Sequence, residues 1–172
     1  MKRSPELRDL SEEHHYGLVA ARALRLAAAG EEPISTAVDE FLAEWTEGIQ
    51  PHFRSEEEVL LPGFAAVAGM DHPLIARTLD EHEELRLEVS RLSRAEGETE
   101  RLVAGRTAQL LHDHIRFEER ILFPAIEECL AGDQLQRLGA SLKRLPYKRE
   151  LASPTCRALS SLPTRGPASR MQ

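Results

Sequence analysis

The sequence predicts an all-α protein, an up-down-up-down four-helix bundle with a short extra C-terminal helix. Alanine, leucine, glutamate and arginine dominate, and aromatic residues make up only 5% of the 172 residues, a mixture that favours helix. Four long segments repeat apolar residues with the period of an amphipathic helix. Because only short connections join these segments, we expect neighbouring helices to pack antiparallel.

Proline and glycine residues indicate where each helix begins and ends. Pro5 suits the first turn of a helix that Gly30 ends, and Pro62-Gly63 is expected to end the second helix. The helices are expected over residues 4–29, 35–61, 73–95 and 98–130, with the short fifth helix over 134–145.

The composition excludes several classes of protein. Apolar residues make up 41% and charged residues 30% of a chain that is long enough to bury a core, which is typical of a soluble globular domain. No apolar run approaches the roughly 18 residues that a membrane span needs. Cys129 and Cys156 are too few for a disulfide framework or for a cysteine-based metal site. No apolar stretch follows the basic pair at the N-terminus, so no secretory signal is recognised and a cytoplasmic location is expected.

Charge divides the chain into two parts. Residues 143–172 carry seven basic groups against one acid, whereas residues 1–142 have a net charge of −13. We therefore expect one bundle domain over 1–142 and a basic, disordered tail over 143–172. An acidic bundle repels nucleic acid, so neither nucleic acid nor a membrane is expected as its partner. The sequence does not identify a partner for the tail.

A repeated motif is the strongest signal in the sequence. Residues 52–62 (HFRSEEEVLLP) align without gaps to residues 114–124 (HIRFEERILFP), with six of the eleven positions identical. Each copy contains H-x-x-x-E, His52 with Glu56 and His114 with Glu118. Residues i and i+4 lie on one face of a helix, so each copy presents an imidazole and a carboxylate side by side.

The other two long helices each contribute a Glu-His pair. These pairs are Glu13-His14 and Glu81-His82, in the similar contexts EEH and DEH. We choose His14 over His15 because His14 lies in the middle of the apolar stripe, while His15 lies about 100° away on the helix. His112 lies almost opposite His114 and is expected at the surface.

The apolar stripes place these histidines and glutamates on inward faces. The expected stripes, taken helix by helix, are Leu7, Leu10, His14, Leu18 and Ala21; Phe41, Trp45, Ile49, His52, Glu56 and Val59; Ile75, Leu79, His82, Leu85 and Val89; and Leu110, His114, Phe117, Ile121 and Ala125, with Glu118 adjoining the last. Ionisable groups inside a bundle are costly unless they are paired or bind a metal. Buried His–Glu pairs without a metal are the structural alternative.

The inward polar residues form a candidate ligand set for metal ions. Its members are His14, His52, Glu56, His82, His114 and Glu118. Six ligands exceed what one tetrahedral zinc ion accepts, but they suit two ions that share the two glutamates and hold two histidines each. Imidazole with carboxylate suits iron, manganese or zinc. Open positions at iron would permit chemistry with dioxygen, peroxide or nitric oxide.

Four further glutamates adjoin this set in the sequence. They are Glu13, Glu57, Glu81 and Glu119. Each is a candidate acceptor for the second ring proton of a ligand histidine. The alternative for each is an ordinary solvated charge.

On these residues, the chain resembles the hemerythrin-like (HHE cation-binding) domains over about residues 7–130. The resemblance rests on the histidine of each Glu-His pair and on both copies of H-x-x-x-E-E-x-x-L-x-P. It implies a four-helix bundle with a non-haem centre of two iron ions, oxo- or hydroxo-bridged. Carried over by position, the implied ligands are His14, His52, Glu56, His82, His114 and Glu118.

The chain departs from the oxygen-carrying hemerythrins of marine animals at two positions. Those proteins have H-x-x-x-H on the third helix, where this chain has Arg86 four residues after His82. They have H-x-x-x-x-D on the fourth helix, where this chain has Glu118 four residues after His114. A water molecule or a carboxylate such as Glu83 is expected to complete the ligand shell. The pattern is more similar to the bacterial and regulatory branch than to the carriers.

The resemblance implies a non-haem di-iron protein that binds, senses or reacts with dioxygen or a related small oxidant, with dioxygen, peroxide or nitric oxide as its small ligand. One alternative is a peroxide-dismutating, catalase-like di-iron enzyme. Another is an iron-responsive regulatory or interaction module without turnover. The sequence leaves open whether the protein is an enzyme.

Overall fold

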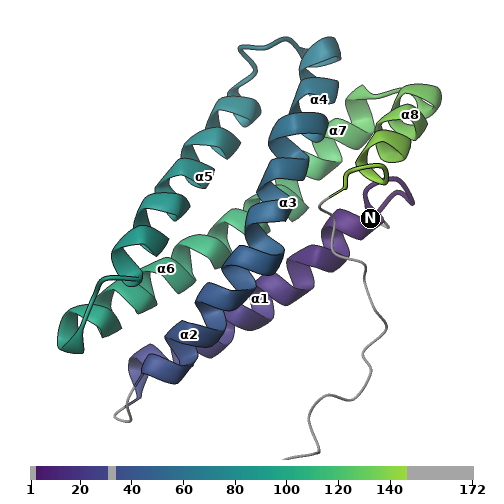
Figure 1. Ribbon diagram of the computed structural model, residues 1–172. Helices are drawn as coiled ribbons and strands as arrows, with labels where there is room; N and C mark the ends of the chain where they lie inside the picture. Colours follow the sequence, from purple (N-terminus) through teal and green to yellow (C-terminus); the bar gives the residue numbers. More distant parts are fainter. Residues whose placement is uncertain (1–2, 31–33, 147–172) are drawn as a thin grey trace, which may run out of the picture.

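Four long helical segments, packed side by side in alternating directions, form the body of the molecule (Figure 1). The structure is a computed structural model that describes residues 3–30 and 34–146. Within these residues the regular structure is helical throughout, and the predicted all-α bundle is confirmed. The first segment is α1 (Arg8–Ala29) and the third is α5 (Pro73–Leu92). A short helix, α8 (Gly132–Leu142), supplies the expected C-terminal addition.

The second and fourth segments contain wide π-helical turns within otherwise regular helix. The second consists of α2 (Ser35–Glu44), η1 (Trp45–Ile49), α3 (Gln50–Ser55), η2 (Glu56–Leu60) and α4 (Leu61–Ala68). The fourth consists of α6 (Gly97–Phe117), η3 (Glu118–Leu122) and α7 (Phe123–Cys129). Each π turn is closed by a hydrogen bond from a backbone N–H to the carbonyl five residues earlier, for example from Leu61 to Glu56.

Each π turn is followed, after one residue, by a proline. Pro51, Pro62 and Pro124 all lie at the second position after a π turn. A proline inside a helix has no N–H to donate, and its ring clashes with the carbonyl four residues earlier. The wider turn rearranges the hydrogen bonds just before the proline, so the helix continues past it.

This arrangement corrects the predicted end of the second helix. The prediction ended the helix at residue 61 because Pro62-Gly63 follows, but the helix runs on to Ala68 and ends at Gly69, whose φ is 94°. The other ends shift by a few residues: the first helix begins at Arg8, the third ends at Leu92, and the short fifth spans Gly132–Leu142.

The π turns also change which residues face inward beyond them. Leu60 and Leu122 are fully buried, whereas the predicted Val59 is only partly buried and Ile121 is 47% exposed. The extra residue in each π turn rotates the following face by about one position.

A separate correction concerns α5, where Leu79 is 42% exposed and its neighbour Thr78 is buried. The Thr78 hydroxyl donates to the carbonyl of Leu74, so this polar group is satisfied inside the bundle.

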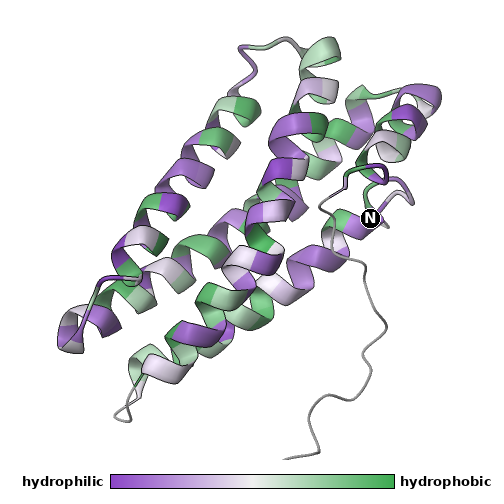
Figure 2. Ribbon diagram, in the orientation of Figure 1, coloured by the Kyte–Doolittle hydropathy of each residue, from purple (hydrophilic) through white to green (hydrophobic). Residues whose placement is uncertain are grey.

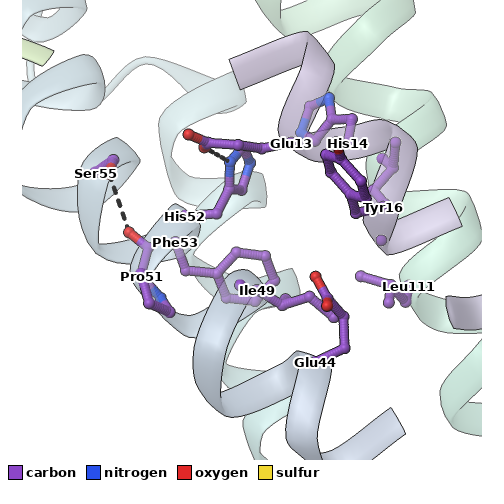
Figure 3. Close-up of a pocket in the computed structure, with 13 residues that line it drawn as sticks. Glu13, His14, Tyr16, Glu44, Ile49, Pro51, His52, Phe53, Ser55 and Leu111 are labelled. Atoms are coloured by element: carbon purple, nitrogen blue, oxygen red, sulfur yellow. Dashed lines mark hydrogen bonds and ion pairs between the residues drawn. The ribbon is translucent and has the colours of Figure 1, made fainter. Parts of the chain in front are cut away.

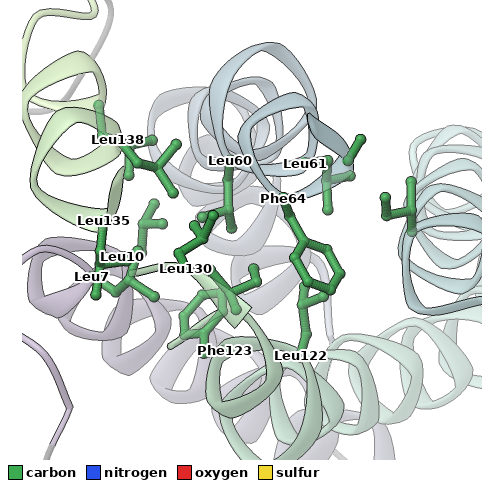
Figure 4. Packing of buried hydrophobic residues seen from close by; sticks show 14 of the residues in the cluster. Leu7, Leu10, Leu60, Leu61, Phe64, Leu122, Phe123, Leu130, Leu135 and Leu138 are labelled. Carbon is green, nitrogen blue, oxygen red and sulfur yellow. The ribbon is translucent and has the colours of Figure 1, made fainter. Parts of the chain in front are cut away.

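Two apolar clusters fill the bundle, one on either side of four buried histidines, His14, His52, His82 and His114. One contains Phe64, Phe123 and Leu138 and includes the face of α8 (Figure 4). The other contains Phe41 and Leu111 and fills the opposite end. Hydrophilic and hydrophobic residues alternate along each long helix, as expected for segments with one buried face (Figure 2).

The tail predicted over 143–172 lies outside the described residues from residue 147 onward. The division into a bundle domain and a tail therefore stays a prediction. In the part of the chain that the structure describes, no helix combines the length and the apolar character needed to cross a membrane.

Candidate metal centre

All six predicted ligand residues meet in the middle of the bundle, and all six are buried. Their donor atoms form two groups, each with all its atoms within 4.8 Å of one another. The first group is His14, His52, Glu56 and Glu118; the second is His82, His114, Glu56 and Glu118. Donor atoms on opposite sides of one metal ion lie up to about 4.4 Å apart, so each group has a spacing suited to one ion. The two glutamates belong to both groups.

The inward-facing atoms of the centre have no hydrogen-bond partner. These atoms are the Nε2 of His14, His52, His82 and His114, and both side-chain oxygens of Glu56 and Glu118. The nitrogens lie 3.0–3.8 Å from the carboxylate oxygens, close enough to attract them but outside hydrogen-bond geometry. Buried polar atoms in native proteins are nearly always hydrogen-bonded. Eight unsatisfied atoms directed at one point are therefore the strongest structural indication of a metal site.

The outward-facing nitrogen of each histidine is bound to a glutamate from a neighbouring helix. His52 Nδ1 lies 2.8 Å from Glu13, and His82 Nδ1 lies 2.7 Å from Glu57. His114 Nδ1 lies 2.8 Å from Glu81.

The fourth pair joins His14 Nδ1 to Glu119 at 2.7 Å. The acceptors thus form a circle in which each helix of the bundle serves the histidine of the next, and the fourth serves the first. All four glutamates suggested as acceptors by the sequence make these contacts, and the alternative of a purely solvated charge is wrong for each. Ionised carboxylates only accept, so each Nδ1 donates to its glutamate and leaves Nε2 as the nitrogen that a metal ion would bind.

The local sequence places these paired roles on adjacent residues. In the Glu-Glu pairs at the start of η2 and η3, the first glutamate points into the centre and the second accepts from a histidine. In the Glu-His pairs of α1 and α5, the histidine points inward and the glutamate accepts from the next helix. Adjacent helical residues point about 100° apart, which allows one residue to face the centre and its neighbour to face the adjoining helix.

The electrostatics of the centre favour ionised carboxylates. Burial alone would lower the pKa of His82, but contacts with Glu118, Glu56 and Glu57 outweigh it and raise that pKa to about 10. Burial would raise the pKa of Glu118, but His114 and His14 hold it well below its usual range. The pKa of Glu119 is lowered to about 2 by His14 and Arg3, against the effect of burial. The raised pKa values of His14, His52 and His82 favour protonated imidazoles beside the carboxylates without metal, and a metal ion would displace those protons.

The structure also shows which neighbouring residues stay outside the donor groups. His15 is exposed and makes an edge-to-face contact with Tyr16, and His112 is bound to Asp113 at the surface. Glu83, considered as an additional ligand, is exposed on α5 and lies in neither donor group. Arg86 occupies the position of the second histidine of H-x-x-x-H and is bound to Glu57.

A small cavity reaches the centre beside the first donor group. It encloses about 20 Å³ between α1, α3 and α6, and it is lined by His14 and His52 together with apolar residues such as Ile49, Phe53 and Leu111 (Figure 3). This volume has room for about one molecule of the size of water or dioxygen. On the other side Phe53 stacks on His82 with ring centroids 3.7 Å apart, and this contact covers the second donor group.

The fold and the site define a helical bundle with a buried histidine–carboxylate centre suited to metal ions. A family model described as the hemerythrin HHE cation binding domain matches residues 6–126, and the chain belongs to this family. A comparison with curated proteins and one with solved structures found no match. The family and the two donor groups together fit a metal-binding protein.

Proposed function

We propose that the six inward-facing side chains bind two iron ions and that the protein binds, senses or reacts with dioxygen or a related small oxidant. The observation that carries this proposal is the set of eight buried, unsatisfied donor atoms in two groups that share Glu56 and Glu118. Sharing both carboxylates lets six residues serve two ions, each with two imidazoles and positions left for a small ligand.

The donor chemistry supports iron. Two neutral imidazoles and shared carboxylates match the preferences of divalent iron, and no cysteine lies among the donors to favour a softer metal. Bound iron would supply the redox chemistry with dioxygen or peroxide. The protein's own residues orient the ligands through the circle of acceptor glutamates and keep bulk water from most of the centre.

The size and lining of the cavity support a very small ligand. A volume of about 20 Å³ favours a very small molecule over an organic substrate, and a largely apolar lining favours a small uncharged molecule over an ion. The cavity opens onto the first donor group, so that group would meet the incoming molecule.

The test is anaerobic loading with Fe(II), followed by an optical spectrum before and after exposure to air. We expect new charge-transfer bands in the near ultraviolet and visible range after exposure, and none in protein loaded with Zn(II). Added peroxide then separates the activities, because catalytic release of dioxygen would indicate the dismutase. An iron-loaded protein whose spectrum ignores both dioxygen and peroxide would contradict the proposed reactivity.

A further inference from the structure

Two arginines outside the donor groups hold the acceptor glutamates in place, one for each metal position. We infer that Arg3 and Arg86 are positioning residues of the centre: Arg3 fixes the His14 ligand through Glu119, and Arg86 fixes the His82 ligand through Glu57. This inference rests on the proposed function as a metal centre. It concerns residues that touch no donor atom of the centre.

Four side chains contact one another in a closed ring: Arg86, Glu57, His82 and Phe53. Its Nη2 donates to both oxygens of Glu57, at 2.8 and 3.0 Å, and Glu57 accepts from His82 Nδ1 at 2.7 Å. The guanidinium carbon also lies 5.8 Å from the ring centroid of Phe53, which stacks on His82 at an interplanar angle of 11°. Both the edge and the face of the imidazole are therefore in contact with groups that Arg86 contacts.

Arg3 closes an equivalent ring around His14. Its Nη2 donates to Glu119 at 2.8 Å, and Glu119 accepts from His14 Nδ1 at 2.7 Å. The guanidinium carbon lies 5.0 Å from the ring centroid of Phe123, which stacks on His14 at an interplanar angle of 12°. Further bonds to Ser11 and Glu127 fix Arg3 itself.

The two rings have the same order of groups, arginine, carboxylate, imidazole and phenyl, although their arginines come from different parts of the chain. Arg86 lies on α5, one turn after His82. Arg3 precedes α1 and lies outside residues 6–126, which the family model matches. The same set of contacts occurs around two different histidines, which distinguishes it from an isolated surface ion pair.

Both arginines are partly buried, so their ion pairs can hold the acceptor glutamates in place. The side chain of Arg3 is 16% exposed and that of Arg86 is 32% exposed. Exposed ion pairs contribute little, whereas partly buried pairs are screened less by solvent and salt. A third arginine, Arg77, binds Glu81 in the same way but is 50% exposed, so we assign it a smaller effect.

The test compares Arg3→Gln and Arg86→Gln with Arg137→Gln. The control also breaks an arginine–carboxylate bond of 2.8 Å, to Asp133, but on the exposed face of α8. The first readout is solvent exchange of the histidine Nδ1–H protons, followed by NMR in Zn(II)-loaded protein. We expect faster exchange at His82 in Arg86→Gln and at His14 in Arg3→Gln, with the other ligand and the control unchanged.

The second readout is release of Fe(II) to a chelator under anaerobic conditions. Loss of an outer partner of a metal-bound histidine costs about 10–100-fold in affinity, so we expect release about tenfold faster in each Gln variant. Arg86→Lys and Arg3→Lys keep the charge but not the planar guanidinium, and we expect them to restore only part of the slow release. Unchanged Nδ1–H exchange at the other histidine shows that a Gln variant is folded.

Exchange and release indistinguishable from Arg137→Gln would overturn the positioning role. Full rescue by lysine would overturn the part assigned to the guanidinium plane. Wild-type protein that binds no Fe(II) would instead contradict the proposed function, so the two failures are distinguishable.

Discussion

Each of the four buried histidines uses its two ring nitrogens in opposite directions. Nδ1 donates to a glutamate on a neighbouring helix, and Nε2 faces the centre without a partner. This arrangement fixes the plane of every imidazole, and the nitrogen that faces the centre, before a metal arrives. Single substitutions in the centre should therefore affect metal binding strongly while neighbouring histidines at the surface tolerate change.

Substitution of a shared glutamate should lower the metal content more than substitution of a histidine that belongs to one donor group. Glu118 belongs to both donor groups and His52 to one, so Glu118→Ala should abolish binding of both ions, whereas His52→Ala should lower the content to about one ion per chain. His112→Ala should keep the wild-type content because His112 faces Asp113 at the surface. Metal analysis after loading and desalting measures all three. Equal content in the three variants would contradict the site assignment.

The two adjacent histidines of α1 provide a matched pair. His14 is buried with its Nε2 3.0 Å from Glu118, while His15 is exposed. We expect His14→Ala, like His52→Ala, to lower the content to about one ion per chain and His15→Ala to retain the wild-type content, measured by the same loading. Retention in His14→Ala with loss in His15→Ala would show that the register of α1 is wrong.

At the scale of elements, the π turns explain why the helices continue through their prolines. The sequence predicted four helices correctly, but the pair Pro62-Gly63 gave a false end to the second because a π turn leaves no simple signature in apolar periodicity. The same turns shifted the inward face from Val59 to Leu60 and from Ile121 to Leu122. At Thr78 the error has another cause, since hydrophobicity alone favours Leu79 and ignores the satisfied hydroxyl.

Helix α8 packs so closely on the turn just before α1 that one glycine has no room for a side chain. A Cβ at Gly139 would lie 2.9 Å from the Cβ and 3.1 Å from the Cα of Glu6, whereas a Cβ at Gly132 would meet nothing within 4 Å. Gly139→Ala should therefore lower the free energy of unfolding by about 1–3 kcal/mol, reduced by up to about 1 kcal/mol of improved helix propensity.

Chemical denaturation of the metal-free protein measures this change, with Gly132→Ala as the control that gains propensity alone. Metal content should stay at the wild-type level in both variants because neither glycine lies near the centre. Gly139→Ala at least as stable as Gly132→Ala would show that α8 is not packed as described.

At the scale of the whole molecule, stability and metal affinity should respond to pH in opposite directions. Without metal, the pKa of His82 is raised to about 10, and those of His14 and His52 are also raised above the unfolded value. A raised pKa contributes stability that is complete below about pH 6.5 and is lost as the pH rises through the folded value. Metal binding displaces the same protons, so affinity should rise over this range.

Denaturation of the metal-free protein at pH 6.5, 8 and 9.5 measures how its stability changes with pH. Zn(II) competition with a chelator of known pH dependence measures how the metal affinity changes with pH. We expect falling stability and rising affinity. Metal-free stability that is constant or rises over this range would contradict the protonation state described for the centre.

Much of the candidate site could be predicted because each motif that supplies its residues occurs twice in the sequence. The repeated H-x-x-x-E-E motif and the two Glu-His pairs place all six buried donors and all four acceptors. The positioning role of Arg3 could not be predicted, since it depends on a contact with Glu119, which lies more than a hundred positions away in the sequence. Arg86 stood out only as the replacement of a histidine, and its bond to Glu57 depends on how η2 packs against α5.

The central claim is that six side chains form one centre for two metal ions. Its most direct test is an anaerobic titration of wild-type protein with Fe(II), with bound metal counted per chain after separation from free ions. The shared carboxylates predict a plateau at two ions per chain. A plateau at one ion, or no retained iron, would contradict the two-ion centre.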